Sequence, residues 1–191
     1  ELNAEHLALI ERQQAERGWP GFIVTSPNCT TTGIAMALKP LDDAFGVRQV
    51  FASTMQAISG AGYPGVASLD ILDNVIPYIA GEEEKIAQET RRLLGHIADG
   101  QRVDAELALS VHANRVPVLD GHTISLSIGC AQPPTTEAAL AVLRDYRGHE
   151  AARTLPSAPA HPILVRAEPD RPQPRRDRDA EGGMTISVGH V

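Results

Sequence analysis

Two kinds of apolar spacing run along this chain and predict a mixture of helices and strands. Apolar residues at helical spacing predict helices over 3–16, 30–44, 67–76, 82–95 and 135–147. Shorter apolar runs predict strands at 22–25, 47–57, 103–112, 116–129, 163–165 and 184–191. Because helices separate the longer strands, the pattern indicates an α/β or α+β fold with helices packed on one side of a sheet.

The clearest strand pattern is a strict alternation of apolar and serine residues. Ile124, Leu126 and Ile128 share one face of the predicted strand, while Ser125 and Ser127 share the other. This period of two predicts a strand in a sheet that has one covered face.

The two ends and one long stretch complete the predicted organisation. The chain begins inside an apparent helix with Asn3 as a candidate N-cap, and it ends in the strand pattern of 184–191. A strand needs a partner, so this ending predicts a segment of a longer protein. Residues 152–182 are rich in proline, arginine and aspartate and predict an extended connection. We therefore expect a single domain over 1–191.

Composition narrows the classes of function. The 191 residues carry a formal net charge of −7, which argues against a nucleic-acid-binding face. No run approaches the roughly 18 apolar residues of a membrane span. Two cysteines do not make a disulfide framework, and no spacing of histidine, cysteine and acidic residues predicts a metal site. We expect a cytoplasmic protein that binds neither nucleic acid nor membrane.

Cys29 is the candidate nucleophile. It lies in the segment SPNCTTTG (26–33), between a predicted strand and a predicted helix. A thiol in that position sits beside unpaired backbone N–H groups and the positive end of a helix dipole, and both favour the nucleophilic thiolate. The alternative is a small buried apolar side chain, which is the commoner role of a lone cysteine.

His122 is the candidate partner of the thiol. A thiolate mechanism needs a group that handles protons, and the chain has seven histidines. His122 follows Asp120 and Gly121 at a turn that opens the serine-bearing strand, so a carboxylate and a small turn residue could orient its imidazole. The alternative is a bystander in a loop, as we expect most of the other histidines to be.

Three charged residues are candidates for binding a small charged substrate. Arg115 precedes the turn at His122 and could hold a carboxylate with its planar guanidinium. Glu82 and Lys85 are three residues apart on one predicted helix face and could bind the opposite charges of a zwitterion. The alternatives are a surface ion pair for Arg115 and ordinary helix initiation for the acidic segment at 82–84.

One glycine motif is rejected as a nucleotide site. Gly60-Ala-Gly62-Tyr-Pro-Gly65 formally matches G-x-G-x-x-G after a predicted strand. Pro64 lies inside the motif, and we expect no βαβ unit around it, so we interpret it as a tight functional or packing loop. Cys130 ends a predicted strand beside a Pro-Pro loop and is interpreted as structural.

Four blocks of sequence, in the same order, resemble aspartate-β-semialdehyde dehydrogenases in their archaeal and fungal-like branch. They are TSPNCTTTG (25–33), STMQAISGAG (53–62), EEEKIAQET (82–90) and NRVPVLDGHT (114–123). The segments DRDA (177–180) and GM (183–184) also fit. The resemblance implies the catalytic and dimerisation domain of that family, a mixed or antiparallel sheet with helices on one face, similar to the C-terminal domain of glyceraldehyde-3-phosphate dehydrogenase.

The same resemblance implies a role for each candidate residue. Cys29 would attack the acyl phosphate or the aldehyde to form a thioester or hemithioacetal, and His122 would act as general acid/base. The other implied roles are carbonyl positioning by Asn28 and Gln56, α-carboxylate binding by Arg115, amino-group binding by Glu82 and phosphate binding by Lys85. The implied reaction is the NADPH-dependent reduction of aspartyl-4-phosphate to aspartate semialdehyde by a homodimer or homotetramer, on the route to lysine, threonine and methionine.

The chain departs from the family in two respects. The family's N-terminal Rossmann domain, with its glycine-rich turn, is absent from these residues, and so is its closing helix. We therefore expect NADP to be bound mainly by a domain outside this chain, and we expect the isolated chain to be inactive. Two alternatives remain open: a malonyl-CoA (acyl-CoA) reductase of the same superfamily, and an inactive structural or dimerisation fragment.

Overall fold

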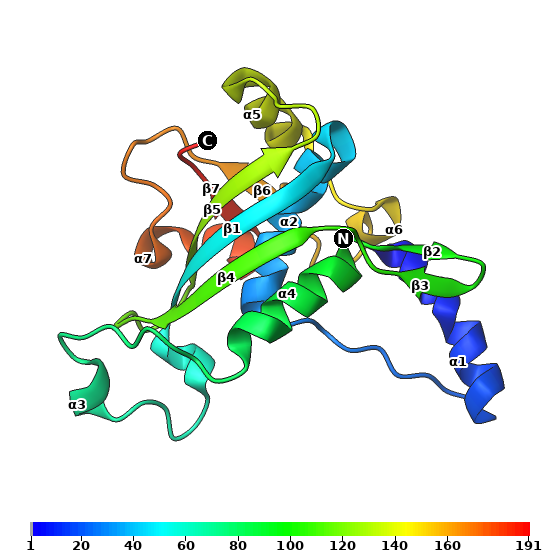
Figure 1. The fold of residues 1–191 in the computed structure, drawn as a ribbon, viewed down its shortest axis with the longest axis horizontal. Coiled ribbons are helices and arrows are strands. Elements are labelled where there is room, and N and C mark those ends of the chain that lie inside the picture. The colour runs from blue at the N-terminus through cyan, green and yellow to red at the C-terminus, as the bar shows by residue number, and fades with distance from the viewer. Residues whose placement is uncertain (1) are drawn as a thin grey trace.

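A mixed three-stranded sheet is the centre of the computed structural model, which describes residues 2–191 (Figure 1). β1 (Val47–Gln56) is the middle strand, and it pairs in parallel with β4 (Ala108–Arg115) and antiparallel with β5 (Thr123–Cys130). Two small sheets lie beside it. Their strands are β2 (His96–Ala98) with β3 (Gln101–Val103), antiparallel, and β6 (Ile163–Val165) with β7 (Ile186–Val188), parallel.

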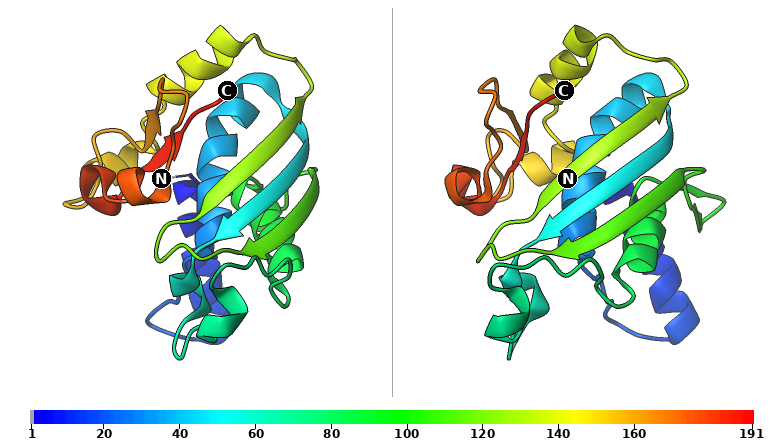
Figure 2. Two further views of the ribbon diagram at one scale, coloured as in Figure 1. Left: turned by 90° about the vertical axis from the view of Figure 1, so that its left-hand side faces the viewer. Right: turned by 60° about the vertical axis from the view of Figure 1, so that its left-hand side comes forward.

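Helices cover one face of the three-stranded sheet, which confirms the predicted architecture. α2 (Cys29–Phe45) packs on β1 and β5, and α4 (Glu82–Leu93) packs on β4. α5 (Thr136–Asp145) packs on α2 and β6. The opposite face of the sheet is turned toward the viewer in Figure 2, with no helix in front of it. The remaining helical segments are η1 (Ala4–Ala8), α1 (Leu9–Arg17), η2 (Ile58–Ala61), α3 (Ser68–Ile71), α6 (Glu150–Arg153), α7 (Pro174–Asp177) and η3 (Ala180–Gly183).

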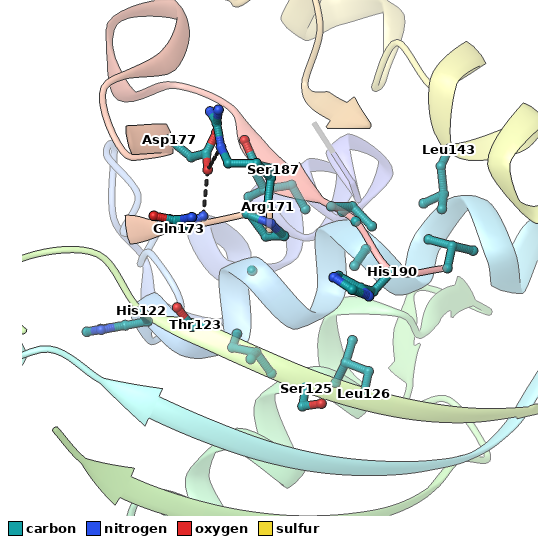
Figure 3. Close-up of a pocket in the computed structure, with 18 of the residues that line it drawn as sticks. His122, Thr123, Ser125, Leu126, Leu143, Arg171, Gln173, Asp177, Ser187 and His190 are labelled. Carbon is teal, nitrogen blue, oxygen red and sulfur yellow. Dashed lines mark hydrogen bonds and ion pairs between the residues drawn. The ribbon is translucent and has the colours of Figure 1, made fainter. Parts of the chain in front are cut away.

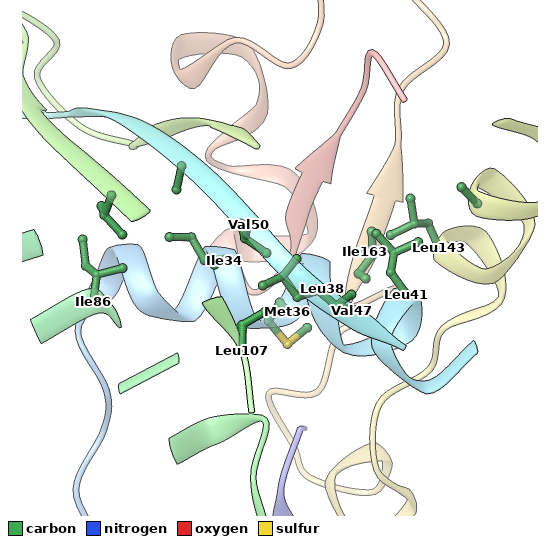
Figure 4. Packing of buried hydrophobic residues seen from close by; sticks show 13 residues of the cluster. Ile34, Met36, Leu38, Leu41, Val47, Val50, Ile86, Leu107, Leu143 and Ile163 are labelled. Carbon is green, nitrogen blue, oxygen red and sulfur yellow. The ribbon is translucent and has the colours of Figure 1, made fainter. Parts of the chain in front are cut away.

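The hydrophobic core lies between α2 and the sheet (Figure 4). Ile34 and Leu38 of α2 and Val50 of β1 are completely buried. β1 alternates buried and exposed side chains along its second half, as a strand with one covered face must. Ile124, Leu126 and Ile128 of β5 pack against this core, whereas Ser125 and Ser127 are exposed. The predicted two-faced character of this strand is therefore confirmed.

The predicted buried strand at 22–25 is wrong. These residues form an extended segment without strand pairing, and the side chains of Phe22, Ile23 and Val24 are more than half exposed. The side chain of Gln13 takes the place of a neighbouring strand: its Nε2 donates to the Ile23 carbonyl at 3.0 Å, and the Ile23 N–H donates to its Oε1 at 2.6 Å. Four apolar residues alone do not make a strand when no sheet edge is adjacent to them.

Two predicted helices are also wrong in extent. The helix predicted over 67–76 is the single turn α3, and the helix predicted over 3–16 is divided into η1 and α1. Neither η1 nor α1 has a buried residue, so no core holds them as one regular element. Helices of this length gain most of their stability from packing an apolar face, which explains the difference.

The strands predicted at 103–112 and 116–129 are placed differently in the structure. The first is interrupted between β3 and β4, and the second begins only at Thr123. Residues 116–119 instead lie along the turn after β1 and are hydrogen-bonded to it. The Val116 N–H donates to the Gln56 carbonyl, and the Ile58 N–H donates to the Val118 carbonyl. The strand predicted at 184–191 is shortened to β7, and β6 is its partner.

Candidate active site

One end of the three-stranded sheet gathers most of the candidate residues. β1 and β4 run in parallel, so their last residues, Gln56 and Arg115, are direct neighbours in the pairing register. β5 runs the other way, so its first residue, Thr123, lies at the same end, directly after His122. Strand direction therefore brings together side chains that are far apart in the sequence.

Asn28 caps α2 and places Cys29 in the first turn of that helix. The Asn28 side-chain oxygen accepts hydrogen bonds from the N–H groups of Thr30 at 2.9 Å and Thr31 at 3.1 Å. Cys29 follows the cap as the first residue of α2 and is exposed. The thiol is thus accessible at the positive end of the helix, where the sequence predicts it.

His122 is held on both sides of its ring. Its Nε2 lies 3.1 Å from the Cys29 sulfur, and its Nδ1 accepts a hydrogen bond of 3.0 Å from the backbone N–H of Ala57. Burial lowers the pKa of His122 below its ordinary value, and the nearby positive charge of Arg115 lowers it further, while Glu82 acts in the opposite direction. The imidazole is therefore biased toward its neutral form.

Glu82 connects three elements of the site. One carboxylate oxygen, Oε1, accepts hydrogen bonds from Nδ2 of Asn28 at 2.9 Å and from Nε2 of Gln56 at 3.0 Å. Nε2 of Gln56 also reaches the Thr54 hydroxyl, at 3.4 Å. Within residues 2–191, Oε2 of Glu82 and the second Nδ2 hydrogen of Asn28 make no hydrogen bond, so both groups are available to a ligand.

Arg115 is buried beneath the turn that follows β1. Arg115 is 6% exposed, and its Nη1 donates a 2.7 Å hydrogen bond to the Ala57 carbonyl. No carboxylate of the described chain forms an ion pair with it, so the alternative of a surface ion pair does not apply. A guanidinium held in this way keeps further N–H groups that can bind an anion.

Lys85 is the one candidate that is not tied into this arrangement. It lies on α4 one turn after Glu82, and its side chain is exposed. Within residues 2–191 its ammonium forms no ion pair. Its spacing from Glu82 places it near the same end of the sheet, while its contacts do not connect it to Cys29 or His122.

A match to a known protein family decides which family this chain belongs to. The family described as semialdehyde dehydrogenase, dimerisation domain, matches residues 38–191. The chain belongs to the semialdehyde dehydrogenase family. The resemblance inferred from the four sequence blocks is therefore confirmed.

Relatives of this semialdehyde dehydrogenase chain extend the match over its whole length. The aspartate-semialdehyde dehydrogenase of Methanothermobacter thermautotrophicus is 48% identical over 191 residues, and that of Archaeoglobus fulgidus is 50% identical over 192 residues. The alignments cover 100% of this chain and 55% and 54% of those proteins. The chain therefore spans about half the length of these curated relatives.

A solved structure agrees with the fold. The crystal structure of aspartate semialdehyde dehydrogenase with NADP from Candida albicans matches with a TM-score of 0.87 and 41% sequence identity. The match covers 99% of this chain and 55% of that one. The predicted fold class, an α/β domain with a mixed sheet like the C-terminal part of this family, is confirmed.

Several residues that position the site were not identified from the sequence. Oε2 of Glu89 accepts the backbone N–H of Asn28 at 2.7 Å, and Oε1 of Glu83 accepts the N–H of Ala113 at 2.9 Å. Glu89 lies seven residues after Glu82, so the two share a face of α4, and this spacing is the signal that could have revealed it. The backbone of Ala57, which binds His122 and Arg115, has no such signal in the sequence.

The glycine motif at 60–65 has a structural role in this semialdehyde dehydrogenase. A Cβ added to Gly60 would lie 2.9 Å from Nη1 of Arg115 and 3.1 Å from Cε1 of His122. The absence of a side chain therefore leaves room for both functional groups, consistent with the interpretation of a functional or packing loop.

The expectation that no βαβ unit surrounds this glycine motif is wrong. β1 and β4 are parallel and α4 lies between them in the chain, so they form such a unit. Even so, the motif begins inside η2 and is followed by the single turn α3 rather than by α4, and α4 opens with three glutamates that would repel a phosphate. The described residues at this motif do not fit a dinucleotide cradle.

A cavity of about 920 Å³ lies on the other side of β5, next to the site (Figure 3). Leu126 of β5, Leu143 of α5 and Ser187 of β7 line it, and His122 lies at its margin. Cys29 is not among its lining residues. We therefore place the chemistry at the exposed start of α2 and not in this cavity.

Two further features bear on function. Within residues 2–191 there is no group of three or more histidine, cysteine and acidic residues that could hold a metal ion. None of the helices in the described chain is long and apolar enough to cross a membrane. The second cysteine differs from the first: burial and the charge of Asp42 raise the pKa of the Cys130 thiol, which favours its unreactive form.

Proposed function

We propose that this chain is the catalytic and dimerisation portion of an NADP-dependent aspartate-semialdehyde dehydrogenase. The reaction is the reduction of aspartyl-4-phosphate to aspartate semialdehyde with release of phosphate, a step in the biosynthesis of lysine, threonine and methionine. The observation that carries the proposal is the 3.1 Å contact between the Cys29 sulfur and Nε2 of His122 at an exposed helix start. The names of the curated relatives support the choice of substrate.

Cys29 acts as the acyl-accepting nucleophile. Its sulfur forms a bond to the acyl carbon, the bond from that carbon to the phosphate oxygen breaks, and a thioester remains. His122 assists at the sulfur and at the oxygen of the reacting carbonyl. Asn28 directly precedes Cys29, and its Nδ2 hydrogen that Glu82 does not bind is suited to orient that oxygen, while Gln56 donates to the same oxygen of Glu82.

Opposite charges bind the amino-acid part of the substrate. Arg115 offers unused guanidinium N–H groups to the α-carboxylate, because among residues 2–191 only its Nη1 is engaged, by the Ala57 carbonyl. Oε2 of Glu82 is available for the ammonium group. Lys85 carries an exposed cation on the same helix, with no ion-pair partner in the described part of the chain, which suits the phosphate.

The reduced cofactor, NADPH, would supply the hydride in this reaction, and we propose that it is bound mainly by residues outside this chain. The Candida albicans relative was solved with NADP, which supports the cofactor. The glycine motif at 60–65 and the acidic start of α4 do not fit its phosphates. The isolated 191-residue chain is therefore inactive, and steady NADPH-dependent turnover by it would contradict this.

The chain assembles as a homodimer or a homotetramer in the cytoplasm. The family match to a dimerisation domain supports an oligomer. The uncovered face of the sheet is suited to the contact, because it presents Phe51, which is 53% exposed, and Met55 among serines. Sedimentation of the full-length Phe51→Glu variant should show a lower mass than the wild type, with the exposed Phe22→Glu as a matched control.

The test of the reaction uses the full-length protein. Phosphate-dependent reduction of NADP with aspartate semialdehyde should be fast, and it should require Cys29. CoA-dependent reduction of an acyl-CoA, without a requirement for phosphate, would instead establish the acyl-CoA reductase. A folded protein with neither activity, whose Cys29 is alkylated no faster than a free thiol at neutral pH, would establish the structural fragment.

A further inference from the structure

Glu89 of α4 holds the backbone of the residue that precedes the nucleophile. Its Oε2 accepts the Asn28 N–H at 2.7 Å, and both residues are partly buried. Among residues 2–191 the Glu89 carboxylate makes no other hydrogen bond and no ion pair. The proposed substrate, an acyl phosphate, is itself anionic, so charge attraction does not explain a carboxylate at this place. The hydrogen bond to Asn28 does.

The start of α2 lacks the acceptor that often serves this N–H. In a capping box, the N–H of the N-cap residue is accepted by a Glu or Gln side chain three residues later. In α2 that position is Thr31, whose hydroxyl is buried and has no hydrogen-bond partner among the described residues. Glu89 therefore supplies, from another helix, the acceptor that α2 does not contain.

α4 holds Asn28 at two separate atoms. Oε1 of Glu82 accepts from its side-chain Nδ2 at 2.9 Å, and Oε2 of Glu89 accepts from its backbone N–H. Seven residues, which correspond to about 10.5 Å of helix, separate the two glutamates. Ile86 lies between them on α4 and is completely buried in the core, so this part of the helix is fixed. The orientation of Asn28 at the start of α2 is therefore set by α4.

The direction of the Cys29 side chain depends on this orientation. Cys29 directly follows Asn28 and is exposed, so the core does not fix its sulfur. The sulfur nevertheless lies 3.1 Å from Nε2 of His122, a distance at which the two groups can act together. Without the hydrogen bond to Glu89 the Asn28 backbone is freer to rotate, and the sulfur moves with it.

We propose that Glu89 is a positioning residue for the nucleophile. Through the Asn28 N–H it holds the Cys29 sulfur within reach of His122 and at a fixed distance from the substrate-binding residues on α4. This inference deepens the proposed function and rests on it for the identity of the reaction. Glu89 has no hydrogen bond to the thiol or to the imidazole within residues 2–191, so it acts through Asn28 and takes no part in proton transfer.

Three variants of Glu89 separate its hydrogen bond from its charge. Glu89→Gln removes the charge and keeps an oxygen at the same reach, Glu89→Asp keeps the charge on a side chain shorter by one methylene, and Glu89→Ala keeps neither. In the full-length protein, kcat should fall roughly ten-fold in Glu89→Asp and Glu89→Ala, the equivalent of one hydrogen bond, with KM nearly unchanged. Glu89→Gln should stay within about three-fold of the wild type.

Asp42→Ala is the matched control, because Oδ1 of Asp42 accepts the Val47 N–H at 2.8 Å at the other end of α2. Asp42→Ala and Glu89→Ala should both lower the unfolding free energy in urea, whereas only Glu89→Ala should lower kcat. Equal losses of kcat in these two variants would overturn the proposal. A slow Glu89→Gln with a fast Glu89→Asp would also overturn it, because the charge would then be what matters. This second comparison decides even if Glu89→Ala does not fold.

A second measurement on the same full-length variants does not depend on turnover. The rate of Cys29 alkylation by iodoacetamide at neutral pH is followed by mass spectrometry of the peptide that contains Cys29. It should fall in Glu89→Asp and Glu89→Ala and stay near the wild-type rate in Glu89→Gln and Asp42→Ala. Equal rates in all four variants would overturn the proposal. Neither substrate nor NADP enters this measurement, so a failure of the proposed reaction and a failure of this proposal are distinguishable.

Discussion

The end of the sheet that holds Cys29 and the segment around Asp177 both concentrate charged residues, but they use them differently. Asp177 is 5% exposed, and both of its carboxylate oxygens are engaged. It binds the Arg171 guanidinium through two nitrogens, accepts the Gln173 N–H at 2.6 Å and pairs with Arg166 at 2.9 Å. One carboxylate thus connects Arg166, Arg171 and Gln173 of this segment.

The charges at the Cys29 end are only partly compensated. Glu82 uses one oxygen for two amides, Arg115 uses one nitrogen for a carbonyl, and neither has an ionic partner within residues 2–191. Burying such groups has a cost that the fold alone does not repay. A compensated cluster therefore indicates a structural function, and groups with unused hydrogen-bonding capacity indicate a ligand.

The largest effect that this comparison predicts is the loss of the nucleophile. Cys29→Ser in the full-length protein should lower kcat by at least roughly a thousand-fold, since a serine hydroxyl is a much weaker nucleophile than a thiolate. Phosphate-dependent NADP reduction measures the change. Cys130→Ser, at the cysteine on the other end of β5, should retain most of the activity. Equal losses in both variants would mean that the thiol is not the reacting group.

Gly60→Ala should have the next largest effect. The new Cβ would press on Arg115 and His122 at 2.9 and 3.1 Å, and a misplacement of about 1 Å can cost roughly a hundred-fold in rate. We expect that loss in kcat/KM with little change in thermal stability. Gly21→Ala is the matched control, because its Cβ meets no atom within 4 Å. Unchanged kinetics for Gly60→Ala would show that the site tolerates movement.

Asp177→Asn tests the cluster that Asp177 forms with Arg166, Arg171 and Gln173. The quantity to measure is the free energy of unfolding and not the activity. Hydrogen bonds from Arg171 are the main cause that lowers the Asp177 pKa from 3.8 to about 2. The folded-state pKa lies below the unfolded one, so this stabilisation is present above about pH 4 and is lost as the pH falls through 2. The variant should lose about 2 kcal/mol of unfolding free energy at neutral pH.

Urea unfolding at a series of pH values measures the effect of Asp177→Asn. Between pH 4 and pH 2 the wild-type unfolding free energy should fall more steeply than that of the variant. Parallel curves for the two proteins would contradict the assignment of this carboxylate to the pH dependence.

The smallest effect is expected where charges are paired but exposed. Lys39 and Asp43 form an ion pair of 2.6 Å along α2, and Asp43 is 56% exposed. Lys39→Gln should change the unfolding free energy by less than about 0.5 kcal/mol, because water and salt screen such a pair. Urea unfolding at neutral pH measures it. A loss as large as that of Asp177→Asn would show that burial is not what separates the two cases.

Much of the site could be predicted because its chemistry is expressed in short segments. Asn28 before Cys29 marks a helix start within four residues, and the alternation after His122 marks a strand with one covered face. The predicted strand at 22–25 failed because an apolar run does not reveal whether a sheet edge is near. Lys85 shows the same limit, since its helical spacing from Glu82 does not establish a contact.

The sequence by itself determined the residue types, the capped start of α2, the two faces of β5 and membership of the semialdehyde dehydrogenase family. The helix start and the two strand faces depend on periodicities and hydrogen bonds that act over a few residues, whereas the family membership rests on the four sequence blocks and the family match. Only the tertiary structure brought His122 to Cys29 across 93 positions and the Ala57 N–H to the far side of the ring. The physical reason is that strand order and direction decide which distant groups meet. A backbone N–H, which every residue except proline carries, gives no sign in the sequence of the partner it will find.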